Sequence, residues 1–304
     1  MQVYRYAFQA MAARNEVVLA AASEASARAH ADAAIAEVQR IEAAYSRYRA
    51  SSIVSRNNAA AGQAQAVAVD DETWALLEHA DALYQHSGGL FDITSGVLRR
   101  VWDFKAGVPP SAAALAEVLP LIDWPSVQRD GRSVRLPQAG MELDFGGFGK
   151  EYAADRAGTL LKTRGVQHGY VNLAGDMRVI GPRPDGTPWR MGIQHPRNAR
   201  ALIAHLPVAQ GGLATSGDYE RYFEHGGQRY CHVLNPHTGM PVNFWQSVSV
   251  LAPLAVMAGT CSTIAMLMQA QALEFLDAAG VSYLAIDALG AVHMASVEPA
   301  AAAA

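Results

Sequence analysis

ELDFGGFGKEYAADRAGTLLKTRGVQHGYVNLAGDMRVI, residues 142–180, is the stretch around which the fold is organised. A short extended run at 143–145 leads into a glycine cluster, and a helical pattern then continues to Gly165. Extended residues return at 171–180. Glycine permits φ > 0 or a close approach to a ligand, and a helix N-terminus favours an anion. The stretch predicts strand, glycine loop, helix and strand, and the loop is either a structural turn or a pyrophosphate site.

Composition excludes several classes of protein. The 304 residues are 51% hydrophobic, which is enough for one large domain or two intimate ones. A net charge of −4 gives no electrostatic footprint for nucleic acid. No run of about 18 apolar residues is present, so we expect no transmembrane segment. The two cysteines, Cys231 and Cys261, match no zinc-binding spacing.

The two ends of the chain differ in character. MQVYRYAFQAM, at the start, lacks the basic segment and apolar core of a secretory signal. We therefore expect a cytoplasmic protein, or a periplasmic one if a leader has been trimmed away. Residues 1–295 are expected to form a single domain, and the alanine-rich residues 296–304 a disordered tail.

Outside the central stretch, helices and strands are mixed rather than alternating, which indicates an α+β protein. Helical spacing of apolar residues predicts helices at 24–48 and 71–86, with Ser23 as an N-cap. Further elements are expected as a strand pair within 3–20, a hairpin at 127–134, strands at 177–180, 189–194, 202–208, 229–234 and 247–251, helices from Pro253 and at 272–279, and a closing strand pair at 283–287 and 291–294.

Several motifs together resemble one family. Asp144, the glycine pair, Lys150 and the segment VNLAGD resemble the ApbE family, the FAD:protein FMN transferases. YSRY at 45–48, ATSGDYERY at 214–222 and HVLNPHTGMPV at 232–242 match the same family in the same order. The resemblance extends over nearly the whole chain. It implies the family's T-fold-like architecture, with mixed, mostly antiparallel sheets and packed helices.

The resemblance also assigns the FAD-binding residues, and most of them have a plainer alternative. By position, Met11 and Tyr48 would contact the flavin, although a core methionine and a packing tyrosine are the ordinary interpretations. Asp92 would contact the adenosine side, although an aspartate at a helix start also caps it. The full set implied is Met11, Tyr48, Leu90, Phe91, Asp92, Asp144, Lys150 and Leu234.

The family's chemistry implies a base and an acceptor. FMN moves from FAD to a threonine or serine of an acceptor flavoprotein, with release of AMP. His232 is the candidate base that takes the proton from the hydroxyl. A lone histidine on a strand is more often structural, but the asparagine and proline that follow it match the family's motif.

The metal site is where the chain departs from the family. The family's last motif is A-D-x-x-x-T, whose Asp and Thr bind Mg²⁺ on the pyrophosphate. Thr263 is present, but Gly259 stands where the aspartate belongs. The resemblance gives Gly147 a main-chain role at the metal. Loss of the carboxylate should weaken Mg²⁺ binding unless Asp218 or a water replaces it.

Two functions therefore remain open. The first is an FAD:protein FMN transferase with altered metal use. The second is a non-catalytic, ApbE-like FAD-binding protein, a carrier or electron-transfer partner that lacks a complete Mg²⁺ site. FAD hydrolysis would need the same metal. Gly259→Asp separates the first two, because a large gain in Mg²⁺-dependent transfer would place the natural protein in the second class.

Overall fold

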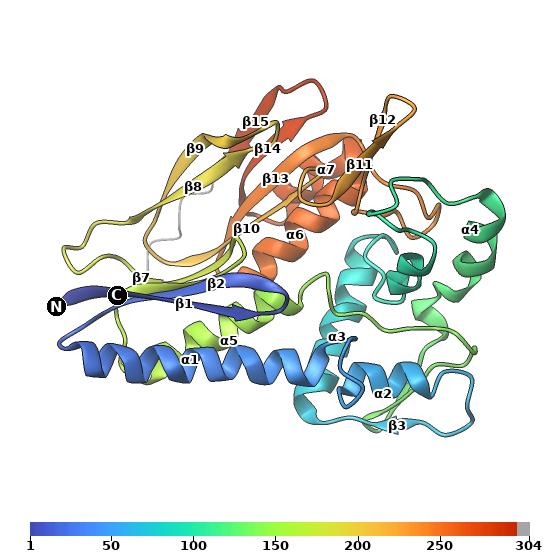
Figure 1. Cartoon of the computed structure of the whole chain (residues 1–304), viewed down its shortest axis with the longest axis horizontal. Coiled ribbons are helices and arrows are strands. Elements are labelled where there is room, and N and C mark those ends of the chain that lie inside the picture. Colours follow the sequence, from blue (N-terminus) through green and yellow to red (C-terminus); the bar gives the residue numbers. More distant parts are fainter. Residues whose placement is uncertain (297–304) are drawn as a thin grey trace.

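A computed structural model describes residues 1–296, so Ser296 is the only described residue of the predicted tail. Within this range, eight strands form one sheet in the order β1-β2-β6-β7-β10-β13-β14-β15 (Figure 1). Every pairing in it is antiparallel. The strands are β1 (Gln2–Ala10), β2 (Ala13–Ala21), β6 (Gly169–Leu173), β7 (Asp176–Gly181), β10 (Gly211–Gly217), β13 (Trp245–Ala252), β14 (Ser282–Asp287) and β15 (Val292–Ala295).

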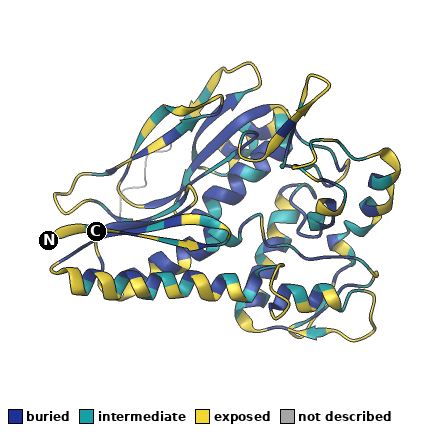
Figure 2. Ribbon diagram, in the orientation of Figure 1, coloured by how far each residue is buried: buried dark blue, intermediate teal, exposed yellow. Residues whose placement is uncertain are grey.

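Both faces of this sheet are covered. Successive side chains of a strand point to opposite faces. In β2, Val17 and Leu19 belong to the core on the helical side, whereas Val18 belongs to the core beneath the hairpin of β8 (Trp189–His195) and β9 (Asn198–Val208). The layers are therefore hairpin, sheet and helices, and Figure 2 shows the central strands buried between them.

The helices on the other face hold the glycine stretch in place. α5 (Gly149–Thr163) packs against α1 (Glu24–Tyr45), α6 (Ala255–Met268) and β7. The remaining helices are α2 (Ile53–Ala59), α3 (Asp71–His86), α4 (Ala112–Val118) and α7 (Ala272–Ala278), with 3₁₀ turns that include Ser95–Arg100. Two small sheets complete the fold: β3 (Val67–Ala68) with β5 (Ser133–Arg135) and β4 (Gln128–Asp130), and β11 (Tyr222–His225) with β12 (Gln228–Cys231).

The α+β class and the antiparallel sheets are confirmed, and several predicted elements have the expected bounds. Ser23 caps α1 by accepting a hydrogen bond from the amide of Ser26 at 3.3 Å. The strand predicted at 143–145 is wrong. There the amide of Leu143 donates to the side chain of Asn58 at 2.7 Å, and that of Asp144 donates to the carbonyl of Ile93 at 2.8 Å. These loop partners take the place of a neighbouring strand.

One segment bears on the expectation of no transmembrane helix. Ala255–Ala278 is long enough and apolar enough to cross a membrane by length and composition, and 56% of its most apolar window is buried inside the protein. α6 packs against β10 and β13. Gln269, at φ 52°, marks the end of α6 within that segment. This burial is what the core helix of a folded domain shows, because its apolar surface is already covered.

The turn between β1 and β2 is strained. Met11 and Ala12 are its two central residues, at φ 54° and 58°, where glycine, asparagine and aspartate are preferred. An alanine in this region costs about 1 kcal/mol. Ala12→Gly should therefore raise the free energy of unfolding by about 0.5–1 kcal/mol, measured by urea denaturation. Ala7→Gly, within β1, is the control and should lower it, because Ala7 is not at positive φ.

Candidate functional site

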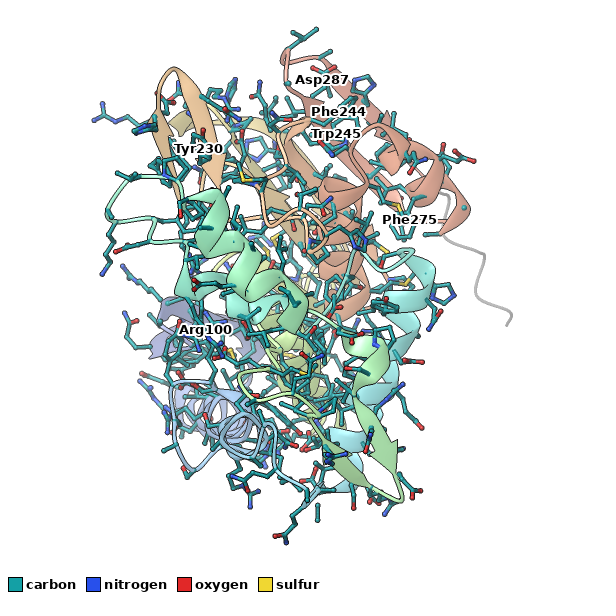
Figure 3. The ribbon with its side chains drawn as sticks, turned by 90° about the vertical axis from the view of Figure 1, so that its right-hand side faces the viewer. Arg100, Tyr230, Phe244, Trp245, Phe275 and Asp287 are labelled. Atoms are coloured by element: carbon teal, nitrogen blue, oxygen red, sulfur yellow. The ribbon has the colours of Figure 1, made fainter. Side chains whose placement is uncertain are left out.

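The hairpin of β11 and β12 places Arg221 beside His232. Arg221 directly precedes β11, and His232 directly follows β12. Tyr222, the first residue of β11, pairs with Cys231, the last residue of β12. The amide of His232 donates to the carbonyl of Arg221 at 3.0 Å. The hairpin is held by aromatic packing, in which Tyr230 stacks on Phe223 at 5.1 Å between ring centroids. Figure 3 labels Tyr230 on this hairpin. The two polar residues are thus positioned by a rigid element.

His232 is a neutral imidazole at pH 7. Burial lowers its pKa to about 4, and the positive charges of Arg221 and Lys150 act in the same direction. Its Nδ1 atom is buried and has no hydrogen-bond partner among residues 1–296. A neutral imidazole has one nitrogen that accepts a proton. The imidazole can therefore accept a proton, but His79 also has a buried ring nitrogen without a partner, so the catalytic role of His232 stays a prediction.

Tyr48 lies among three arginines. It is 79% exposed, and its hydroxyl accepts a hydrogen bond from Arg47 at 2.8 Å. That bond lowers the pKa of Tyr48, and the charges of Arg221 and Arg99 lower it further. Arg47 also forms an ion pair with Asp144. The Arg47 guanidinium lies over one face of the ring, 4.9 Å from the ring centroid, so a planar group would stack on the other face.

Three ionisable residues lie close together at the start of α5: Lys150 and Glu151 of the helix and Asp176 of β7. Phe148 occupies the N-cap position, and no side chain caps the helix. The Lys150 amine donates to the Asp176 carboxylate at 2.6 Å. Burial disfavours the charge on Lys150, but Asp176 and Glu151 outweigh it and hold the pKa of the amine above its usual value. Burial, with the nearby charge of Asp176, raises the pKa of Glu151 to about 8.

The segment at 90–92 lies against the glycine loop. A Cβ atom on Gly147 would come within 2.9 Å of the Phe91 ring, so only glycine fits there. The carboxylate of Asp92 accepts from the Thr94 amide at 2.7 Å and from the Trp124 amide at 3.3 Å. Main-chain amides of the protein thus already bond to this carboxylate, as the capping interpretation requires. A contact between Asp92 and adenosine stays a prediction.

The three predicted apolar contacts come from different parts of the fold. The Met11 amide donates to Glu42 of α1 at 2.7 Å, and Arg49 donates to the same carboxylate at 3.4 Å. Met11 is thereby brought to the end of α1 that leads to Tyr48. Leu90 packs against the core around β13 and α6, whereas Leu234 packs against the aromatic core under the β11–β12 hairpin.

Three hydroxyl groups gather where β10 meets α6. The Ser216 hydroxyl lies 3.0 Å from the Thr263 hydroxyl and 2.8 Å from that of Ser262. Asp218, the possible replacement ligand, is instead held by both terminal nitrogens of Arg197, at 2.6 and 2.7 Å. Among the residues described, no three His, Cys, Asp or Glu side chains form a metal site. Hydroxyls with one or two carboxylates are nevertheless the kind of donor that Mg²⁺ uses together with a phosphate.

Three residues of this region were not named from the sequence. Arg221 lies inside the ATSGDYERY motif, and its charge next to a motif histidine could have identified it. Arg47 stands within YSRY and could have been found in the same way. Glu151 could not, because its burial follows from the packing of α5 against α6 and leaves no trace in the local pattern.

Sequence comparison finds relatives over most of the chain. A protein of Treponema pallidum named FAD:protein FMN transferase is 34% identical over 260 residues, which is 77% of this chain and 71% of the relative. A Klebsiella pneumoniae protein of the same name is 35% identical over 210 residues, which is 67% of this chain and 64% of the relative.

Structural comparison gives the same result. The crystal structure of the ApbE protein of Thermotoga maritima matches with a TM-score of 0.89 at 30% identity, covering 97% of each chain. The flavin transferase ApbE of Vibrio cholerae matches with a TM-score of 0.86 at 22% identity over 98% of this chain and 97% of the other, which supports the fold alone. The family model described as "ApbE family" matches residues 11–285, and the chain therefore belongs to the ApbE family.

Proposed function

We propose that the protein is an FAD:protein FMN transferase, which moves FMN from FAD to a threonine or serine hydroxyl of an acceptor flavoprotein and releases AMP. Membership of the ApbE family and the names of the relatives support this function. The observation in the site that carries it is the neutral, unpartnered imidazole of His232 beside the cationic Arg221.

The reaction requires a base and a positive environment. The hydroxyl oxygen of the acceptor attacks the FMN phosphorus of FAD, and the bond from that phosphorus to the AMP oxygen breaks. AMP leaves with the electron pair, and the hydroxyl proton passes to the neutral imidazole of His232. A base that is neutral before the reaction is ready to accept this proton. Arg221 and Lys150 would stabilise the negative charge on the pyrophosphate.

The two halves of FAD would meet different surfaces. Tyr48 offers an exposed ring for stacking on the isoalloxazine, with Met11 and Leu234 as apolar contacts. The adenosine side would lie near Leu90, Phe91 and Asp92, which border the glycine loop. Asp144 would reach FAD together with Arg47.

The predicted metal is Mg²⁺, and the Thr263 hydroxyl and the main chain at Gly147 are the residues predicted to hold it. When bound, Mg²⁺ would neutralise charge on the pyrophosphate. Gly259 offers no carboxylate to it, and this gap is what favours the alternative function of a non-catalytic FAD-binding protein.

The test is a transfer assay. The protein is incubated with FAD, MgCl₂ and an acceptor flavoprotein that carries the target threonine. AMP release and covalent flavin fluorescence on the acceptor are then measured. Both products should appear, and replacing the target threonine with alanine should abolish the fluorescence. FAD binding without either product would establish the non-catalytic alternative.

The pH dependence follows from the depressed pKa of His232. The base is active when neutral, so kcat/KM for FAD, which reports the free enzyme, should persist as the pH falls through 6.5. It should decline only toward the pKa of about 4. Initial rates between pH 4 and pH 8 give the profile. An acidic limb centred near 6.5 would show that burial does not perturb this histidine.

A further inference from the structure

Glu151 is a buried carboxylate without a sufficient partner. It is the third residue of α5 and only 7% exposed. Its Oε2 atom is buried and has no hydrogen-bond partner among the described residues. An isolated buried carboxylate is costly unless it is paired or coordinates a metal. The Lys150 amine, the positive charge that acts on Glu151, already donates to Asp176.

The carboxylate lies where a side chain at position 259 would begin. A Cβ atom built on Gly259 would come within 2.5 Å of both Cγ and Oε1 of Glu151. Real side chains do not approach this closely, so a residue larger than glycine at 259 would require the Glu151 side chain to move. The space left by the missing aspartate of the A-D-x-x-x-T motif is therefore filled by another carboxylate.

The remaining donors of the motif lie on the same face of α6. Gly259 and Thr263 are four residues apart, so Thr263 lies one turn beyond the contact with Glu151. The Thr263 hydroxyl is hydrogen-bonded to the hydroxyl of Ser216 in β10. Thr215, the residue before Ser216 in that strand, donates its amide to Asp176. Two carboxylates and one hydroxyl thus converge on the start of α5.

The donor atoms of this cluster suit a divalent cation. The carboxyl groups of Glu151 and Asp176 have Lys150 as a neighbour, and its amine donates to Asp176 and leaves Oε2 of Glu151 unpaired. Mg²⁺ is usually held by one or two carboxylates together with substrate phosphates. Asp218 is not available for this task, because Arg197 holds both of its oxygens.

We infer that Glu151 supplies the carboxylate ligand for Mg²⁺ that position 259 lacks, so that it reaches the metal from α5 instead of α6. This inference rests on the proposed function, which requires the metal at the pyrophosphate. In this arrangement the carboxylate ligand comes from Glu151 of α5 instead of position 259 of α6, and Thr263 keeps its role as the hydroxyl ligand.

The first test measures metal binding directly. MnCl₂ is titrated into the protein saturated with FAD, and free Mn²⁺ is followed by electron paramagnetic resonance. Wild type should bind about one Mn²⁺, and MgCl₂ should displace it. Glu151→Gln, which keeps the shape of the side chain, should weaken this binding at least about tenfold. Glu117→Gln, on the exposed surface of α4, should bind as wild type does.

The second test moves the ligand back. Gly259→Asp alone should disturb the packing of α5 and α6, because the new side chain meets Glu151. Glu151→Ala combined with Gly259→Asp should restore Mn²⁺ binding to within a few fold of wild type. If the double variant is unfolded by circular dichroism, the Glu151→Gln titration decides alone.

The outcomes separate the inference from the proposed function. Binding of Mn²⁺ by Glu151→Gln with wild-type affinity would overturn the role of Glu151 and leave the transferase intact. A wild-type protein that transfers FMN without any divalent metal would do the same. A wild type that binds FAD and Mn²⁺ but releases no AMP with the acceptor would overturn the transferase and keep Glu151 as a metal ligand.

Discussion

Replacing His232 with alanine should reduce the rate of FMN transfer by about 10²–10⁴-fold, the usual effect of losing a positioned general base. The reason is that the neutral imidazole of His232 receives the acceptor's proton, and burial keeps that imidazole neutral at pH 7. The loss should fall on kcat, because His232 acts on the proton of the acceptor hydroxyl, and the KM for FAD should change only a few fold. Initial rates of AMP release at saturating FAD measure this effect.

A matched variant controls for general damage. His225 is exposed in β11 of the same hairpin, so His225→Ala changes a histidine without touching the site. It should transfer FMN at the wild-type rate. His232→Asn keeps a polar side chain of similar reach but has no basic nitrogen, so it should be as slow as His232→Ala. Transfer by His232→Asn at near wild-type rate would assign the histidine a structural role and leave the base unidentified.

The sequence was sufficient where local chemistry decides the structure. Ser23 could be recognised as a helix cap, and Asp71–His86 as a helix, because capping and apolar spacing are properties of neighbouring residues. The order of the motifs along the chain was enough to predict the family, and the family in turn predicted the fold. Residues 143–145 were misjudged, because their apolar, extended character is shared by strands and by loops that bond to a side chain such as Asn58.

The site was predicted less completely than the fold. The motifs identified His232 and Lys150. In the structure, the positive charge of Arg221 acts to lower the pKa of both residues. The motifs also led to the prediction that Gly259 stands where the family has an aspartate. What they could not give is the crowding at this position, where a Cβ atom would come within 2.5 Å of Glu151, because only the packing of α5 against α6 creates that contact.

The same helix pair provides the second large effect, this time on stability. Asp155 of α5 accepts hydrogen bonds from the first two amides of α6, from Ala255 at 2.9 Å and from Val256 at 2.8 Å. Leu254, at the N-cap of α6, provides no side-chain cap, so Asp155 performs this task from another helix. Its negative charge also suits the helix N-terminus. Arg178 lies 3.5 Å from the same carboxylate.

Asp155→Ala should lower the free energy of unfolding by about 3 kcal/mol, because it leaves buried amides and a guanidinium without their charged acceptor. Urea denaturation followed by circular dichroism measures the loss. Asp155→Asn keeps one carbonyl oxygen and should lose about half as much. Asp32→Ala is the control, because its pair with Arg28 is 3.9 Å long and exposed, and such pairs contribute less than about 1 kcal/mol.

This variant also connects stability to the site. Asp155 fixes the start of α6 relative to α5, and the carboxylate of Glu151 and the hydroxyl of Thr263 project from these same two helices. If both hold one Mg²⁺, loosening the joint should weaken Mn²⁺ binding in the folded Asp155→Asn protein, although Asp155 is no ligand. Asp32→Ala should leave that binding unchanged. A destabilised Asp155→Asn protein with wild-type Mn²⁺ affinity would show that the metal does not depend on the register of α5 against α6, and the ligand exchange between the helices would lose its structural basis.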